Sequence, residues 1–130
     1  MVLVHGGRDH CRSWDWVAEE LSKDWHVVAP DLRGHGDSAW SEDGEYSVRA
    51  CVYDLAQLIH QQKFDPVTIV SHSYAGAISL RYAGIYPEKV RKIVAIEGLG
   101  PSPKILKERF SGPPGERMRE WIDSKRAAAG

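Results

Sequence analysis

Ser73 stands in the sequence IVSHSYAG, residues 69–76, where β-branched residues give way directly to small ones. A serine hydroxyl on a sharp turn between a strand and a helix is exposed as a nucleophile for acyl transfer. Strand and helix pass close together at such a turn, so the residues two before and two after the serine must be small. Ser71 and Ala75 meet this requirement, and Gly76 follows. The competing interpretation is a serine that caps the next helix.

A glycine-rich loop near the N-terminus is a candidate for the second part of this chemistry. Acyl transfer needs hydrogen-bond donors aimed at the oxyanion that develops on the substrate carbonyl. One donor is the backbone N–H of the residue after the nucleophile, here Tyr74. The other comes from a loop after an earlier strand, and VLVHGG at residues 2–7 places such a loop there. Gly7 is the predicted donor, because a residue without a side chain lets substrate approach its backbone.

Short apolar runs alternate with helical patterns over the first hundred residues, and these elements must hold the two loops. The patterns predict strands at residues 2–4, 25–29, 67–70 and 90–96, and helices at 14–21, 48–59 and 74–86. Ser13 and Ser47 are the predicted caps of the first two helices. The strand at 67–70 is continuously apolar, which is typical of a parallel sheet covered on both faces. The sequence therefore predicts an α/β fold with a mostly parallel central sheet flanked by helices.

The sequence changes character after Glu97. The segments GLGPSPK and SGPPG are rich in loop-forming residues, and two charged, amphipathic helices are predicted at 104–110 and 116–127. We therefore expect residues 1–100 to form one core and residues 101–130 to begin a helical cap or lid.

Several segments together resemble the α/β-hydrolase superfamily. They are VLVHGG, a tryptophan soon after it (Trp14), VVAPDLRGHGDS, and the strand-turn-helix-strand stretch at residues 67–98. They occur in the order and spacing of the branch that contains cap-bearing esterases, C–C bond hydrolases, haloalkane dehalogenases and epoxide hydrolases. The resemblance covers roughly residues 1–100 and implies a partial α/β-hydrolase fold. The usual serine turn of this family is GHSxGG, from which this chain departs at Ser71 and Ala75.

The resemblance implies that Ser73 is the nucleophile and that Gly7 and Tyr74 form the oxyanion hole. His5, Gly6 and His72 are then supporting residues, and the loop that begins at Asp31 is a scaffold turn, although Asp31, His35 and Asp37 could be mistaken for a triad. A serine nucleophile argues against dehalogenase and epoxide hydrolase activity, because those enzymes attack with a carboxylate. The expected function is hydrolysis of a small ester-like substrate through an acyl-enzyme, without a cofactor or metal.

The general base is missing after the predicted nucleophile. In this family the order along the chain is serine, then acid, then histidine. All six histidines precede Ser73; they are His5, His10, His26, His35, His60 and His72. Glu97 follows Ser73 by 24 residues and is a possible alternative acid, or a carboxylate that merely ends a strand. We expect an N-terminal-to-central fragment of a hydrolase of roughly twice this length; the alternative is a non-catalytic pseudo-hydrolase or binding protein.

Composition excludes several other classes. The formal net charge is −1 and basic residues are scattered, so nucleic acid is not an expected partner. No apolar run approaches the roughly 20 residues of a membrane span. The two cysteines, Cys11 and Cys51, lack metal-binding spacing and are expected to be reduced. The absence of a GxGxxG or Walker loop argues against nucleotide binding. We expect a cytoplasmic protein whose partner is a small-molecule substrate.

Overall fold

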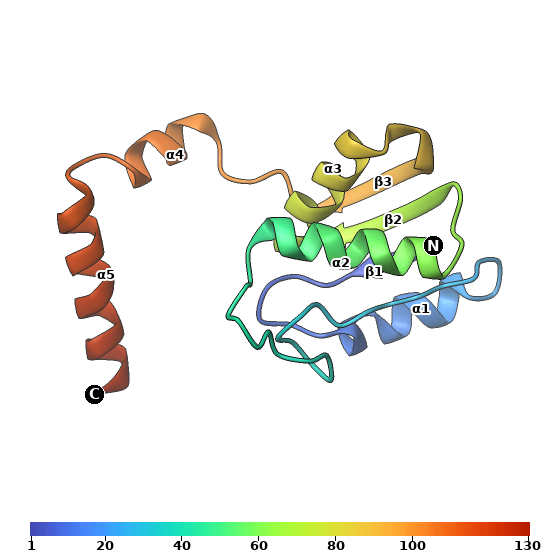
Figure 1. Cartoon of the computed structure of the whole chain (residues 1–130), viewed down its shortest axis with the longest axis horizontal. Coiled ribbons are helices and arrows are strands. Elements are labelled where there is room, and N and C mark those ends of the chain that lie inside the picture. Colours follow the sequence, from blue (N-terminus) through green and yellow to red (C-terminus); the bar gives the residue numbers. More distant parts are fainter. The chain divides into compact units, whose positions relative to one another are not determined.

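The computed structural model describes the backbone of residues 1–130 and every side chain except that of Arg109. The chain divides into two compact units, residues 1–100 and residues 101–130, each described below by itself (Figure 1). None of the helices in this described chain combines the length and hydropathy needed to traverse a bilayer.

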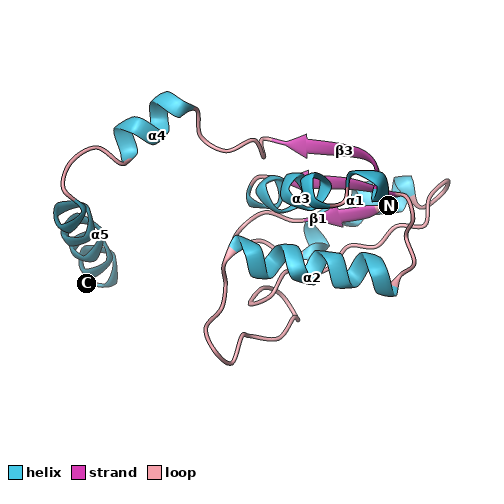
Figure 2. Cartoon of the chain, turned by 45° about the horizontal axis from the view of Figure 1, so that its top comes forward, coloured by secondary structure: helices cyan, strands magenta, loops and turns pink.

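A parallel sheet forms the centre of the first unit. Its strands are β1 (Val2–Val4), β2 (Val67–His72) and β3 (Val90–Ile96), in the order β1-β2-β3. Both pairings are parallel, so all three strands end at the same edge of the sheet (Figure 2). This arrangement confirms the predicted α/β fold with a parallel sheet.

The strand predicted at 25–29 is wrong in its extent. Only Val28 pairs with the sheet, in an isolated parallel bridge to Val2. The Leu3 N–H donates to the Val28 carbonyl at 2.9 Å, and the Val28 N–H donates to the Met1 carbonyl at 3.0 Å. The segment at 25–29 therefore adds one bridge at the edge of β1, whereas β2 pairs with all three residues of that strand.

Helices connect the strands of the first unit. They are the 3₁₀ helix η1 (Cys11–Trp14), α1 (Asp15–Leu21), α2 (Val48–Gln61), α3 (Tyr74–Ile85) and the 3₁₀ helix η2 (Pro87–Lys89). The predicted cap at Ser47 is confirmed, since its hydroxyl accepts the Ala50 N–H at 3.2 Å. The predicted cap at Ser13 is wrong, because its hydroxyl instead donates to the Asp9 carboxylate. His10 caps the preceding 3₁₀ turn in its place.

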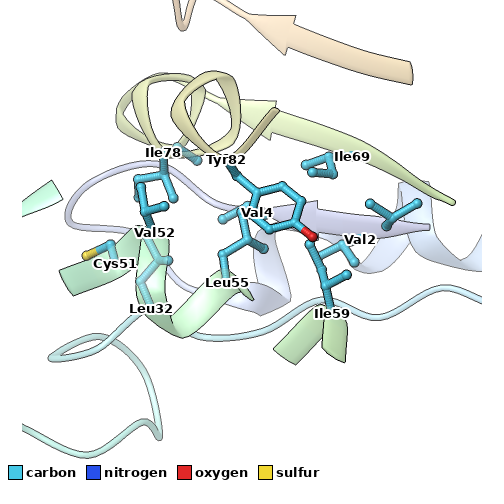
Figure 3. Packing of buried hydrophobic residues seen from close by; sticks show 12 residues of the cluster. Val2, Val4, Leu32, Cys51, Val52, Leu55, Ile59, Ile69, Ile78 and Tyr82 are labelled. Atoms are coloured by element: carbon cyan, nitrogen blue, oxygen red, sulfur yellow. The ribbon is translucent and has the colours of Figure 1, made fainter. Parts of the chain in front are cut away.

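The hydrophobic core lies between one face of the sheet and the helices α2 and α3. Alternate sheet residues such as Val4 and Ile69 point toward Leu55 of α2 and Tyr82 of α3 (Figure 3). The apolar stripe on α2 has the helical spacing seen in the sequence, and Cys51, Val52, Leu55 and Ile59 are its buried members. This packing fixes α3 against β2 and thereby positions the turn that joins them.

The second unit contains two helices, α4 (Pro103–Arg109) and α5 (Pro114–Ala129). The Ser102 hydroxyl caps α4 by accepting the Ile105 N–H at 3.4 Å. Met118, Trp121 and Ile122 form an exposed apolar stripe on α5. The bounds are close to the predicted helices at 104–110 and 116–127, while a role as a cap or lid stays a prediction.

Candidate active site

Ser73 lies at the turn between β2 and α3 in a backbone conformation that L-residues rarely adopt. Its φ is 52° and its ψ is −117°. It occupies the cap position of α3, yet no described residue donates a cap hydrogen bond to its hydroxyl. The backbone holds the turn instead: the Ser73 N–H donates to the Ile96 carbonyl and the Gly76 N–H donates to the Ser73 carbonyl, both at 2.9 Å. The geometry therefore disfavours the interpretation of Ser73 as an ordinary helix cap.

The first turn of α3 crosses the end of β3 with no side chain between the two backbones. A Cβ atom placed on Gly76 would lie 2.3 Å from the Cα of Gly98. One placed on Gly98 would lie 2.6 Å from the Cα of Gly76. Sequence reasoning noticed Gly76 but missed Gly98. The signal was a glycine just after a predicted strand, which marks a close approach of another backbone.

The loop after β1 lies directly beside this turn. A Cβ atom on Gly6 would be 3.3 Å from the Cβ of Ser73, and one on Gly7 would be 3.6 Å from the Cβ of Tyr74. The fold thus brings together Gly6, Gly7, Ser73 and Tyr74, which sequence reasoning selected from two segments about 65 residues apart. A side chain at Gly6 would crowd Ser73 and His72, so either the loop or these two residues would have to shift by a few tenths of an ångström to admit it.

Two histidines hold the loop after β1 through hydrogen bonds to backbone. His5 is buried; its Nε2 accepts the Leu32 N–H at 3.0 Å and its Nδ1 donates to the Gly6 carbonyl at 2.7 Å. His35 repeats the pattern, with Nε2 accepting the Arg8 N–H at 3.1 Å and Nδ1 donating to the Arg33 carbonyl at 2.9 Å. Each pair of bonds requires the neutral, Nδ1-protonated imidazole. Sequence reasoning missed the part played by His35.

The loop that begins at Asp31 is closed around the Asp31 carboxylate. Its oxygens accept the Cys11 N–H at 2.7 Å and the Asp37 N–H at 2.9 Å. These backbone donors, Cys11 first, lower the pKa of Asp31. A Cβ atom on Gly36, whose φ is 50°, would lie 2.2 Å from an Asp31 carboxylate oxygen. The carboxylate is therefore engaged in shaping the loop.

Glu97 lies between two residues that contact the serine turn. Ile96 accepts the Ser73 N–H, and a Cβ atom on Gly98 would be 3.1 Å from the Ser73 carbonyl oxygen. Glu97 is exposed and has a φ of 56°. Ser73 and Glu97 come directly after β2 and β3, and Arg8, with a φ of 60°, lies in the loop that follows β1. Strained backbone thus gathers at one edge of the sheet, as is common at functional sites.

His72 is half-buried and faces a different space from Ser73. It lines a cavity of about 270 Å³ together with His5, Asp9, Ser13, Trp14 and Ile96. A Cβ atom on Gly6 would lie 3.1 Å from its Nδ1. A larger cavity, of about 560 Å³, lies between α2 and the loop at residues 38–43, away from the predicted site residues. Neither cavity has Ser73 among its lining residues.

The Tyr74 side chain points into the core beneath the turn. Its phenol oxygen is 3.9 Å from the buried Cys51 sulfur on α2. Burial raises the pKa of Tyr74 to about 12, so the phenol stays protonated near neutral pH. Tyr74 can therefore contribute its backbone N–H to a site while its side chain anchors the turn to α2. The described side chains include no group of three or more His, Cys, Asp or Glu placed to hold a metal ion.

Comparison with known families identifies this arrangement. A sequence model of the alpha/beta hydrolase fold matches residues 1–129. The chain belongs to the α/β-hydrolase family. The serine turn described above, with its strained backbone at the end of a parallel strand, lies within the matched residues.

Relatives of this α/β hydrolase include enzymes with several substrates. Lipase LipV of Mycobacterium tuberculosis is 31% identical over 128 residues, which are 98% of this chain and 44% of the lipase. The 2-hydroxy-6-oxo-2,4-heptadienoate hydrolase of Pseudomonas putida is 35% identical over 105 residues, 78% of this chain and 38% of that enzyme. A solved thioesterase domain from the curacin biosynthetic pathway superposes with a TM-score of 0.79 at 25% identity, over 94% of this chain and 42% of the domain.

This α/β hydrolase spans less than half the length of the curated relatives that it matches. The family model covers the strand, serine turn and glycine loop described above. The relatives named here are hydrolases, so the chain is related to hydrolytic enzymes.

Proposed function

We propose that this chain carries the nucleophile and oxyanion hole of a serine hydrolase that cleaves a small ester-like substrate. The observation that carries the proposal is the turn at Ser73, where a strained backbone presents a hydroxyl that does not cap the helix. The glycine loop beside it supports the same chemistry, because Gly6 and Gly7 let the backbone of this loop lie close to the serine and Tyr74.

In this proposal the Ser73 Oγ attacks the carbonyl carbon of the ester, and its proton passes to a general base. The carbonyl oxygen becomes an oxyanion that accepts hydrogen bonds from the backbone N–H groups of Gly7 and Tyr74. Collapse of the tetrahedral intermediate breaks the C–O bond, and the base returns the proton to the leaving alcohol. Water then attacks the acyl-enzyme by the same steps in reverse, which releases the acid and regenerates Ser73.

The base must be an imidazole outside residues 74–130, since this segment contains no histidine. His72 is a poor candidate because it lines a cavity that does not include its neighbour Ser73. We propose that the longer protein supplies the histidine, as the partial coverage of the relatives suggests. Glu97 is our candidate for the acid that orients it, because it lies between two residues in contact with the serine turn.

The proposed substrate is a small, partly apolar ester, with C–C or amide bonds as less favoured alternatives. The lipase among the relatives supports an ester substrate. The heptadienoate hydrolase is the reason for retaining a C–C bond as an alternative. A serine in place of an aspartate at position 73 argues against epoxide and haloalkane substrates. We place the reaction in the cytoplasm, without a cofactor.

The test is labelling by a fluorophosphonate probe, which reacts with activated serines. In the longer protein that contains this chain we expect labelling that Ser73→Ala abolishes and the matched control Ser22→Ala leaves unchanged. In residues 1–130 alone we expect little or no labelling or turnover. An unlabelled longer protein, or label that persists in Ser73→Ala, would refute the proposal.

A non-catalytic role is the second candidate, favoured by the lack of histidine after Ser73. It predicts that residues 1–130 form a monomer with a single cooperative unfolding transition and bind small molecules without turnover. Aggregation or a molten state, seen by light scattering and near-UV circular dichroism, would count against it.

A further inference from the structure

The hydroxyl of Ser71 is buried immediately below the serine turn. Ser71 stands two residues before Ser73, where the family pattern has glycine, and it is 0% exposed. Its Oγ is 2.8 Å from the Oγ of Ser79 and 3.5 Å from the Val94 carbonyl oxygen. A buried hydroxyl that loses its hydrogen-bond partner destabilises the folded state. The Ser71 hydroxyl therefore needs Ser79 as its close hydrogen-bond partner.

The direction of the hydrogen bonds follows from the remaining contacts of Ser79. Its Oγ is 3.0 Å from the Ala75 carbonyl oxygen and 3.3 Å from that of Gly76. The Ser79 proton points to Ala75, because the alternative, in which Ser79 donates to Ser71, would leave the Ser71 proton only the 3.5 Å contact with the Val94 carbonyl. Ser71 must then donate to Ser79. The result is a chain of two hydrogen bonds, from Ser71 to Ser79 to the Ala75 carbonyl.

We propose that Ser79 is a positioning residue that joins both flanks of the serine turn. Ser71 lies two residues before Ser73 and Ala75 two residues after it, so the chain of bonds closes around the nucleophile. A strained φ persists only where the surroundings fix it, and the two bonds tie the strand before the turn to the helix after it. This inference rests on the proposed role of Ser73, although its structural part can be tested without catalysis.

Ser79 has no contact with Ser73 itself and acts through the backbone on either side. The Ser73 N–H is bonded to the Ile96 carbonyl and the Gly76 N–H to the Ser73 carbonyl. Loosening of the turn therefore exposes these two amides to solvent. The Leu3 N–H, bonded to the Val28 carbonyl, lies in another part of the sheet and serves as the internal reference.

The first measurement is a double-mutant cycle on the folding equilibrium constant from urea unfolding. Ser79→Ala should lower the constant about tenfold or more, because it leaves the Ser71 hydroxyl buried without its partner. In the Ser71→Ala background the same change should cost about threefold or less, since no stranded hydroxyl remains. Thr68→Val, a hydroxyl deletion on the same strand, is the matched control. Additive costs would overturn the inference, as would loss of folding in both Ser79→Ala and the double variant.

The second measurement is hydrogen exchange of individual amides. In Ser79→Ala the Ser73 and Gly76 amides should exchange about tenfold faster, while Leu3 changes less and Thr68→Val has no such local effect. Equal acceleration of all three amides would mean a merely structural role and would overturn the positioning claim.

Fluorophosphonate labelling separates this inference from the proposed function. If the longer protein is labelled, Ser79→Ala should slow the maximal labelling rate more than it weakens probe binding. If the wild-type protein is not labelled, the proposed function fails, while the cycle and the exchange data still decide whether Ser79 holds the turn.

Discussion

Two loops follow parallel strand segments in this chain and differ in how their polar groups are used. In the loop that begins at Asp31, the carboxylate, the Arg33 guanidinium and the His35 ring all bond within the protein. In the turn at Ser73, the backbone is held but the hydroxyl makes no bond to the helix that it precedes. The first loop uses its polar groups to hold its own shape, while the second leaves the Ser73 hydroxyl without a bond to its helix, as the proposed function requires.

The largest effect on stability is expected where Gly76 of α3 crosses Gly98, below the serine turn. Gly76→Ala would place a Cβ 2.3 Å from the Cα of Gly98, and backbone cannot move aside as a side chain could. We expect a loss of at least about 3 kcal/mol in the free energy of unfolding, or failure to fold.

Gly84→Ala is the control for this substitution, because nothing lies within 4 Å of its Cβ position. Since Gly84 is in the same helix, we expect a gain of about 0.5 to 1 kcal/mol. Urea unfolding measures both variants. Equal destabilisation by the two would show that helix context, and not the crossing, sets the cost.

The next largest effect on stability is expected in the loop that begins at Asp31. Asp31→Asn replaces a carboxylate that accepts two backbone N–H groups, and we expect a loss of about 2 kcal/mol at pH 7. Asp37→Asn, at an exposed side chain, should cost about 0.5 kcal/mol or less. A similar cost for both, in urea unfolding at pH 7, would mean that the carboxylate does not shape the loop.

The same loop predicts a dependence of stability on pH. Because folding lowers the pKa of Asp31, its contribution is complete above the unfolded value, near 3.8, and disappears as the pH falls through the lower folded value. Wild type should therefore lose more stability than Asp31→Asn when the pH is lowered from 5 toward 2. Parallel curves for the two proteins in thermal unfolding would contradict this.

Arg33→Lys should have a smaller effect. Arg33 donates to both oxygens of Asp54, at 2.6 and 2.8 Å, and to the Glu45 carbonyl at 2.7 Å. Lysine cannot reproduce the forked geometry, but the pair is partly exposed, so we expect a loss of about 1 kcal/mol in urea unfolding. Arg49→Lys, on the exposed surface of α2, is the control and should be neutral.

A change of similar size to that of Arg33→Lys, but of opposite sign, is expected at the serine turn. Ser73→Gly removes the strain of a positive φ, which is worth about 1 to 3 kcal/mol, against an entropic cost of about 0.5 to 1 kcal/mol. We expect a net gain of about 1 kcal/mol in the free energy of unfolding. A loss would show that the Ser73 side chain stabilises the fold, which would erase the contrast between the two loops.

The sequence was sufficient to predict the parallel sheet and the meeting of Gly7 with Tyr74, because apolar periodicity and family-like spacing determine both. It did not predict the extent of the strand at 25–29, because an apolar run indicates burial but not which of its residues reach the backbone of β1. The hydrogen bond between Ser71 and Ser79 could not be predicted from the sequence either. The two residues lie on different elements, and each alone is an unremarkable small residue in an apolar segment.

The contact between Gly76 and Gly98 has a mechanical consequence. Most packed elements meet through side chains, whose rotamers absorb small displacements, whereas here two main chains touch directly. Any force that shifts the end of β3 is passed to the first turn of α3 without a compliant layer between them. The position of Ser73 is thus coupled to the end of β3, and substitutions among the neighbours of β3 that keep both glycines should shift the serine turn.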